Sequence, residues 1–251
     1  MIIRKSPEEL ERMRRAGRIT AMAREAVLEA VRPGITTAEL DSIAEKVIRD
    51  EGATPSFKGY RGFPGSICAS INEEVVHGIP GERELEEGDL FKVDVGAIWD
   101  GFHGDSAVTV FVGRPPSPTA EALVETTRRS LEAGIERLRP GGRVSDVGHA
   151  VQRVVEEAGF DVVREYVGHG VGRALHEDPH IPNYGAPGHG PEIKPGLVVA
   201  IEPMVNVGTW ETEVLSDDWT VVTKDGELSA HFEHTVAVTE DGPEILTLSP
   251  S

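Results

Sequence analysis

Residues 90–111 read LFKVDVGAIWDGFHGDSAVTVF, and this stretch decides the fold. Its two largely apolar runs flank Asp100-Gly101, and an Asp-Gly pair between such runs is a strong signal for a two-residue β-hairpin turn. With that turn, the numbers of paired residues sum to 201, so Gly96 lies directly opposite Asp105. The sequence therefore predicts a long antiparallel hairpin over residues 89–112.

One face of this hairpin carries two carboxylates, while the other is apolar through Phe91, Val93 and Val95. Asp94 and Asp105 are diagonal neighbours, whose backbones we expect about 7–8 Å apart. Two carboxylates this close repel each other unless one keeps its proton or a cation lies between them. A lone strand aspartate is commonly solvated or protects a sheet edge, but Asp94 lies inside an apolar run, where an unpaired charge is costly. The pair therefore favours a metal site.

Each half of the chain begins with two helix signals, the first closed by a Pro-Gly stop and the second by a glycine. The predicted helices span about 6–31 and 36–52 in the first half, and about 117–138 and 145–159 in the second. Capping boxes of the form Ser/Thr-x-x-Glu open the first two helices. The stops and final glycines of the second half follow those of the first by 107 residues.

The two halves also deliver a carboxylate at equivalent places. Gly88 precedes an apolar run that reaches Asp94, and Gly196 precedes one that reaches Glu202, six residues after the glycine in both cases. Helix–helix–strand order arises often by chance, but shared stops at nearly one offset indicate a duplicated unit. We therefore expect an α+β fold with pseudo-two-fold symmetry, in which helices cover one face of a curved, mostly antiparallel sheet. Residues 1–251 would form one domain with halves of about 1–115 and 116–251.

Three further candidate ligands lie in the second half. Glu202 ends an apolar strand before Pro203, Glu233 lies in a strand predicted over 229–239, and His169 lies in the glycine loop 168–172. Four carboxylates and one imidazole suit divalent ions such as Mn²⁺, Fe²⁺ or Co²⁺ better than structural zinc. Carboxylates can bridge two metals about 3.5–4 Å apart, a spacing that activates water for hydrolysis. The glycine run also loosely resembles a dinucleotide-binding turn, but its spacing does not fit.

Two histidines are candidates for a role beside such a centre. His77 ends a short apolar run, and His176 follows the glycine loop. A lone histidine is more often a hydrogen-bonded structural residue, but next to a metal a neutral imidazole can donate to a developing oxyanion or to a leaving amine. The remaining histidines are predicted to be structural; they are His103, His149, His180, His189, His231 and His234.

Composition limits the other classes of function. The chain has 25 basic and 43 acidic residues and a net charge of −18, which argues against direct nucleic-acid recognition. The lone Cys68 excludes an intrachain disulfide and a thiolate zinc site. Residues 1–10 lack an apolar signal core, and no run of about 18 apolar residues could span a membrane. We expect a soluble, cytoplasmic protein.

The ordered set of residues resembles the type I methionine aminopeptidases of the pita-bread metallopeptidase superfamily. The resemblance covers essentially the whole chain and is carried by the five candidate ligands, by residues 100–106 (DGFHGDS), and by residues 72–80 around His77. It implies a pita-bread fold, a single catalytic domain, and removal of the N-terminal methionine from nascent proteins and peptides. It also implies a monomer, with the ribosome as a candidate partner.

Roles for individual residues follow from this resemblance. Asp94 would chelate one ion and reach a second, Asp105 and Glu233 would bridge the two, and His169 and Glu202 would complete the second ion's ligands. The ions would be two of Co, Mn, Fe or Zn, and a hydroxide bridging them would attack the first peptide carbonyl. Glu202 would also serve as general base. His77 and His176 would contact the substrate, steady the tetrahedral intermediate and help to protonate the leaving amine.

The resemblance also places a methionine pocket. Its walls would be Phe57, Tyr60, Phe63, Cys68, Leu175 and Trp219, residues that by composition alone could equally be ordinary core. Flat or soft apolar walls suit a thioether, which gains from sulfur–aromatic contacts. Many relatives carry Tyr at the position of Phe63 and Phe at that of Leu175, and some carry His at that of Arg61.

Two rival functions share this fold. Xaa-Pro aminopeptidases and proline dipeptidases use a similar metal set but usually carry an additional N-terminal domain, for which the position of the first ligand strand leaves no room. Binding proteins that have lost catalysis typically lack metal ligands, whereas all five positions are filled here.

Overall fold

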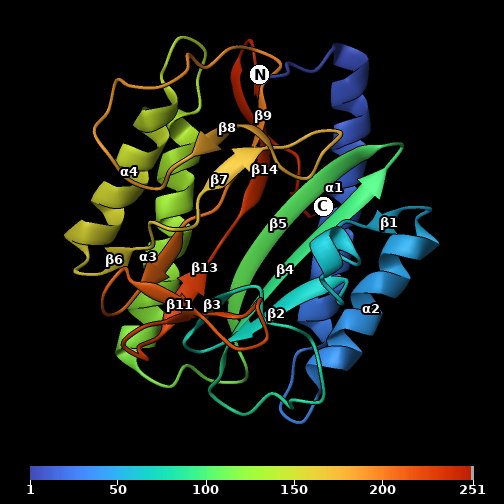
Figure 1. Cartoon of the computed structure of the whole chain (residues 1–251), viewed down its shortest axis with the longest axis vertical. Helices are drawn as coiled ribbons and strands as arrows, with labels where there is room; N and C mark the ends of the chain where they lie inside the picture. Colours follow the sequence, from blue (N-terminus) through green and yellow to red (C-terminus); the bar gives the residue numbers. More distant parts are fainter. Residues whose placement is uncertain (250–251) are drawn as a thin grey trace.

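Four long helices frame the molecule in two pairs (Figure 1). The computed structural model describes residues 1–249. Helices α1 (Pro7–Ala30) and α2 (Thr37–Asp50) pack together in the first half, and α3 (Pro118–Arg137) and α4 (Val144–Glu157) in the second. Ser6 and Thr36 form the two predicted capping boxes, each with the glutamate three residues on. All four predicted helices are confirmed, and each of their ends lies within two residues of the predicted one.

The predicted hairpin forms the longest pair of strands. β4 (Leu90–Trp99) and β5 (Phe102–Phe111) pair antiparallel in the expected register, with Gly96 opposite Asp105. Asp100 and Gly101 both adopt positive φ, as a two-residue hairpin turn of this kind requires. β2 (Ile67–Ile71) and β1 (Thr54–Pro55) pair with the other edge of β4. The hairpin therefore lies within a four-stranded antiparallel sheet.

The second half builds a five-stranded antiparallel sheet and a three-stranded one, and it adds two strands to β3 of the first half to form a second three-stranded sheet. The five-stranded sheet consists, in spatial order, of β15 (Gly242–Ile245), β14 (His234–Thr239), β9 (Val198–Ile201), β7 (Gly168–Gly170) and β8 (Glu177–Ile181). The small sheets consist of β13 (Ser229–His231), β10 (Met204–Asn206) and β6 (Asp161–Val162), and of β11 (Thr212–Val214), β12 (Val221–Thr223) and β3 (Glu74–Val76). A short 3₁₀ helix, η1 (Tyr60–Gly62), precedes β2.

Equivalent pairings recur in the two halves. Thr54 pairs with Ile98 in the first half, and Asp161 pairs with Asn206 in the second. The isolated bridge between Thr36 and Glu84 likewise has a counterpart in the second half, between Arg143 and Glu192. Each residue of the second half follows its counterpart by 107 or 108 residues. The duplicated unit predicted from the helix stops is therefore present in the strand pairing as well.

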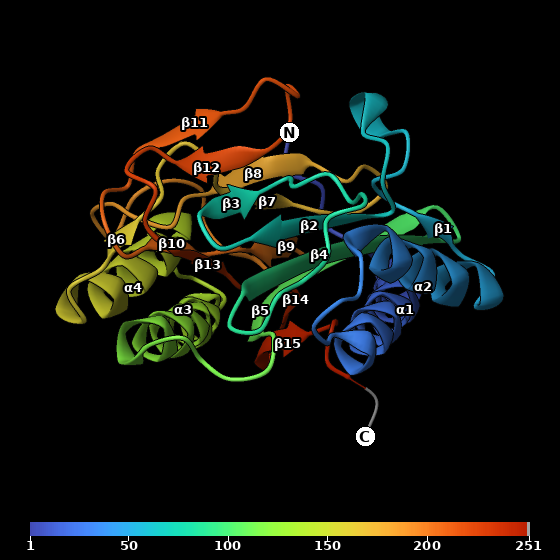
Figure 2. The ribbon, with the colours of Figure 1, turned by 90° about the horizontal axis from the view of Figure 1, so that it is seen from below.

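The helices lie on one side of the sheets, and β3, β11 and β12 lie on the other (Figure 2). Separate apolar cores join each helix pair to its sheet: α1 and α2 pack on the hairpin through residues such as Ile19 and Phe91, and α3 packs on β9 through residues such as Ile135 and Ile201. Burying such side chains contributes about 1.5–3 kcal/mol each. The α+β fold with helices on one face is confirmed.

Two local predictions were wrong. The glycine-rich residues 168–170 form strand β7 rather than a loop, because β8 and β9 pair with both of its edges. The strand predicted over 229–239 is interrupted between His231 and His234, so Glu233 lies in the break between β13 and β14. Within residues 1–249, no helix is long and apolar enough to cross a membrane.

Candidate metal centre

The two halves meet along a seam between β5 and residues 231–235. The Thr109 hydroxyl donates to the His231 carbonyl (2.7 Å) and accepts from the His231 amide (2.9 Å). The Glu233 amide donates to the Ala107 carbonyl at 2.9 Å. Further along, the Asp105 amide donates to the Thr235 hydroxyl at 2.9 Å. This seam places Glu233, from the break in the second half, beside the carboxylates of the hairpin.

The structure brings all five predicted ligands to one cavity, although they come from three strands, the residue after a fourth strand and a strand break. Ligand atoms of Asp105, His169 and Glu233 lie within 4.8 Å of one another. His169 Nε2 lies 3.8 Å from Asp105 Oδ2 and 3.5 Å from Glu202 Oε1. On its other side, His169 Nδ1 is 2.9 Å from the Gly170 carbonyl, a contact that makes Nδ1 the donor and leaves the Nε2 lone pair facing the carboxylates.

Three of the four carboxylates each have one buried oxygen without a partner in the described part of the chain. Within residues 1–249, Asp94 Oδ1, Asp105 Oδ1 and Glu233 Oε1 are buried without a hydrogen bond. Burial raises the pKa of Asp94 to about 7, and burial together with the neighbouring carboxylates raises the pKa of Asp105 and of Glu233 well above the ordinary range. Buried charges of one sign are stable only when they are paired or coordinate a metal. The unpartnered oxygens and the free imidazole nitrogen therefore fit divalent cations.

Glu202 has a neighbour that the sequence did not single out. His231 Nε2 lies 3.8 Å from Glu202 Oε2, and the His231 side chain is only 2% exposed. Burial lowers the pKa of His231 to about 3, so the imidazole is neutral at pH 7. Its spacing of two from Glu233, in a segment predicted to be a strand, was the available signal that both side chains point to one face.

The predicted methionine pocket forms the apolar end of the same cavity, whose volume is about 300 Å³. Its residues form one cluster of Phe57, Phe63, Cys68 and Leu175, flanked by Tyr60, Ile79 and Trp219. Phe63 and Trp219 meet edge to face, with ring centroids 5.0 Å apart. Burial raises the pKa of the Cys68 thiol, which keeps this wall uncharged.

Both candidate histidines line the same cavity as the carboxylates and this pocket. The rings of His176 and His169 lie 4.2 Å apart, and the Tyr60 hydroxyl shares a 2.8 Å hydrogen bond with His176 Nδ1. His77 contacts Trp219 and adopts φ 62°, an uncommon left-handed conformation. Burial lowers the pKa of His77 to about 4, and burial followed by the charge of Arg61 lowers that of His176. Both imidazoles are therefore neutral hydrogen-bonding groups at pH 7.

Comparison with known proteins agrees with this geometry. The chain matches the model of metallopeptidase family M24 over residues 11–240. It is 57% identical to methionine aminopeptidase 1 of Bacillus subtilis over 247 residues, which cover 98% of this chain and 99% of that protein. The structure of methionine aminopeptidase from Thermotoga maritima is similar with a TM-score of 0.97 at 48% identity, over 98% of this chain and 99% of that one. The prolidase of Pyrococcus furiosus shares the fold, with a TM-score of 0.80 at 24% identity over 99% of this chain and 66% of that one.

The chain therefore belongs to metallopeptidase family M24. Within this family it groups with the type I methionine aminopeptidases, and the resemblance seen in its sequence is confirmed. The chain is thus an aminopeptidase with the pita-bread fold, and a metal-dependent hydrolase.

Proposed function

We propose that this enzyme removes the N-terminal methionine from peptides and nascent proteins with the help of two divalent ions. The observation that carries the proposal is a single cavity with two unlike ends. One end gathers the Nε2 of His169 and four carboxylates, of which those of Asp105 and Glu233 are buried, and the other is the aromatic and thiol-lined pocket. A methionine side chain in the pocket would bring its own α-amine and first peptide bond towards the carboxylates.

The ligands would be Asp94, Asp105, His169, Glu202 and Glu233. Four carboxylates carry more negative charge than one divalent ion neutralises, which supports two ions of the class Co, Mn, Fe or Zn. When bound, these ions would supply a water of lowered pKa as the nucleophile and polarise the peptide carbonyl. Ligand atoms of Asp105 and Glu233, one from each half, lie within 4.8 Å of each other, close enough that both side chains would hold the same pair of ions.

The protein's own groups would manage the protons. Glu202 has a raised pKa through burial and the charge of Asp94, which suits a general base that takes a proton from water and passes it on. The neutral His77 and His176 can donate to the substrate carbonyl or to the leaving nitrogen. Tyr60 fixes the ring of His176 through the hydrogen bond to Nδ1, leaving Nε2 for the substrate.

The pocket would select methionine by shape and by soft contacts. Phe63 and Trp219 offer ring edges and faces, and sulfur–aromatic contacts contribute about 0.3–1.5 kcal/mol each. We place the reaction in the cytoplasm, with a monomeric enzyme that meets nascent chains, so the ribosome is a candidate partner.

A direct contest between substrates tests the proposal. The Mn²⁺-loaded enzyme is given Met-Gly-Met-Met and an Ala-Pro peptide, and released amino acids are measured by chromatography. We expect methionine release, its loss after exhaustive chelation, and its return with Mn²⁺ or Co²⁺. Faster cleavage of the Ala-Pro peptide would instead assign the enzyme to the proline-specific relatives. Undiminished turnover after chelation would contradict the metal mechanism.

A further inference from the structure

Lys92 carries a buried amino group that the proposed chemistry does not use. It lies on β4, on the same face of the strand as Asp94, and the residue is only 2% exposed. Within residues 1–249, no carboxylate comes within 4.0 Å of its ammonium, so Lys92 makes no ion pair there. A buried lysine without a carboxylate partner is rare and costly.

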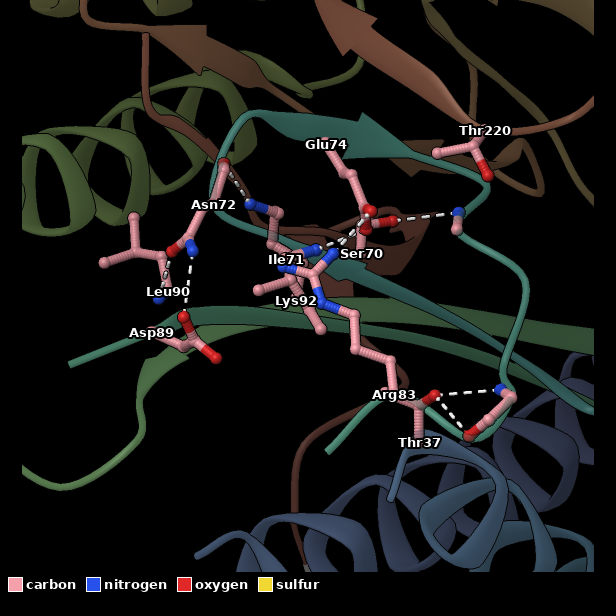
Figure 3. Close-up of polar contacts among 12 residues, drawn as sticks. Thr37, Ser70, Ile71, Asn72, Glu74, Arg83, Asp89, Leu90, Lys92 and Thr220 are labelled. Atoms are coloured by element: carbon pink, nitrogen blue, oxygen red, sulfur yellow. Dashed lines mark hydrogen bonds and ion pairs between the residues drawn. The ribbon is translucent and has the colours of Figure 1, made fainter. Parts of the chain in front are cut away.

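The ammonium binds two backbone carbonyls instead, and Figure 3 shows its contact with that of Asn72. Lys92 Nζ donates to the carbonyl of Asn72 at 2.7 Å and to that of Ser229 at 2.8 Å. The Asn72 carbonyl also accepts a hydrogen bond from the Ser229 amide at 3.2 Å, so the three residues form one hydrogen-bond network. Because both carbonyl oxygens can only accept, the contact needs a donor at the position of Nζ.

Asn72 is itself held firmly in place. It adopts φ 55°, its side-chain amide donates to Asp89 at 2.8 Å, and its side-chain oxygen accepts from the Leu90 amide at 2.9 Å. These contacts aim the Asn72 carbonyl at Lys92 (Figure 3). The acceptor site around Nζ is therefore held in place by other contacts and does not depend on Lys92 alone.

Each segment in this hydrogen-bond network continues along the chain to a residue of the proposed metal centre. Lys92 precedes Asp94 by two residues on a continuous strand. From Asn72 the chain runs through β3 to His77, and from Ser229 it runs through β13 to Glu233. Lys92 also pairs across the hairpin with Thr109, whose hydroxyl donates to the His231 carbonyl in the seam between the two halves. One side chain thus joins the segments that carry a ligand of each half and a candidate substrate-binding histidine.

We propose that Lys92 is a positioning residue, whose buried amino group sets the spacing between the two halves of the metal centre by binding the carbonyls of Asn72 and Ser229. This inference rests on the metal-binding role proposed for Asp94 and Glu233. Without the ammonium, the Ser229 carbonyl would lose this donor and the Asn72 carbonyl would keep only the Ser229 amide, so the Ser229 segment could shift relative to β4. The emptied acceptor site, lined by carbonyl oxygens, would be suited to a small ammonium ion.

The test compares Lys92→Met with Lys46→Met, a control on the exposed face of α2, where Lys46 pairs with Asp50. Mn²⁺ affinity is measured by titration calorimetry on chelator-treated protein, and kcat and KM on Met-Gly-Met-Met. We expect about 10–100-fold weaker Mn²⁺ binding in Lys92→Met, the range for residues that orient metal ligands, with a fall in kcat and little change in KM. The control should match the unmodified enzyme.

Chemical rescue provides the second arm. In Lys92→Ala, ammonium chloride is expected to recover most of the Mn²⁺ affinity, whereas tetramethylammonium chloride at the same ionic strength, too large for the acceptor site, should not. Should Lys92→Met fail to fold, Lys92→Arg takes its place, because its larger head must push the two carbonyls apart and weaken Mn²⁺ binding.

Unchanged Mn²⁺ affinity in a folded Lys92 variant, even with a lowered melting temperature, would reduce Lys92 to a structural role and overturn the inference. Failure of the unmodified enzyme to cleave the methionine peptide while it still binds Mn²⁺ would count against the proposed function alone. Failure of the unmodified enzyme to bind Mn²⁺ would overturn both.

Discussion

The two halves of the molecule share a frame but present their metal ligands differently. In the first half, Asp94 and Asp105 lie within the ten-residue strands of the hairpin, and the residues before and after each of them are paired with the other strand. In the second half, Glu202 follows the four-residue β9 and Glu233 lies between two strands. Duplication therefore supplied equivalent helices and strand pairs, while irregular backbone in one half lets its carboxylates reach those of the other.

The largest effect is expected from removing the central carboxylate of either half. Asp105→Asn and Glu233→Gln keep shape and remove charge, so the fold should persist. We expect each to lower kcat at least about 100-fold, since even residues that only orient metal ligands contribute 10–100-fold. Steady-state kinetics in excess Mn²⁺ measures the loss. Near-normal rates in one variant would show that the carboxylate it replaces is not a ligand.

The pH dependence of stability separates the metal-free from the metal-loaded protein. The pKa of Asp94 is raised from 3.8 to about 7, so the metal-free fold is fully stabilised by the protonated form below about pH 4 and loses that contribution as the pH rises towards 7. Metal ions displace the protons, so Mn²⁺ should raise the melting temperature more at pH 7 than at pH 5. Calorimetry at both pH values checks this. An equal gain at both would contradict the assignment of raised pKa values to the ligands.

His231 tests how the second half supports its irregular ligand. His231→Ala removes the neighbour of Glu202 Oε2. We expect about 10–100-fold weaker binding of one ion, because residues that orient ligands act in this range. His149→Ala, on α4 and away from the cavity, is the control. Wild-type stoichiometry and affinity by calorimetry would mean that Glu202 needs no such support.

Tyr60 tests the substrate side of the centre. Tyr60→Phe keeps the ring in the pocket and removes the hydroxyl that bonds His176 Nδ1. The loss of a hydrogen bond worth about 0.5–1.5 kcal/mol predicts a roughly 2- to 13-fold fall in kcat with little change in metal affinity. A matching fall in Mn²⁺ affinity would show that Tyr60 acts on the metal centre instead.

The smallest effect is expected at Leu175. Leu175→Phe adds an aromatic wall to the pocket, and one sulfur–aromatic contact contributes only about 0.3–1.5 kcal/mol. The change should appear in kcat/KM for methionine peptides over norleucine peptides, measured side by side. Loss of metal binding in this variant would show that the apolar pocket and the metal ligands do not act independently.

The sequence was sufficient for the features that local chemistry determines. The Asp-Gly turn sets the register of the hairpin, and with it the diagonal placement of Asp94 and Asp105. Capping boxes and Pro-Gly stops mark the helices. The repeated offset then predicts the fold class, because two copies of one unit limit the possible arrangements.

The features that the sequence did not reveal depend on contacts between distant segments. Residues 168–170 lack strand propensity and become β7 only because β8 and β9 pair with them. The break at Glu233 interrupts an apolar alternation that continues on both sides. Burial of Lys92 and His231 was likewise unreadable, because their partners come from segments more than a hundred residues away or from neighbouring strands.

Anomalous diffraction from crystals of the enzyme grown with Mn²⁺ is the most direct test of the central claim. The account predicts two manganese peaks, one nearer Asp94 and one nearer His169 and Glu202, with Asp105 and Glu233 between them. A single peak, or none among these five side chains, would contradict it.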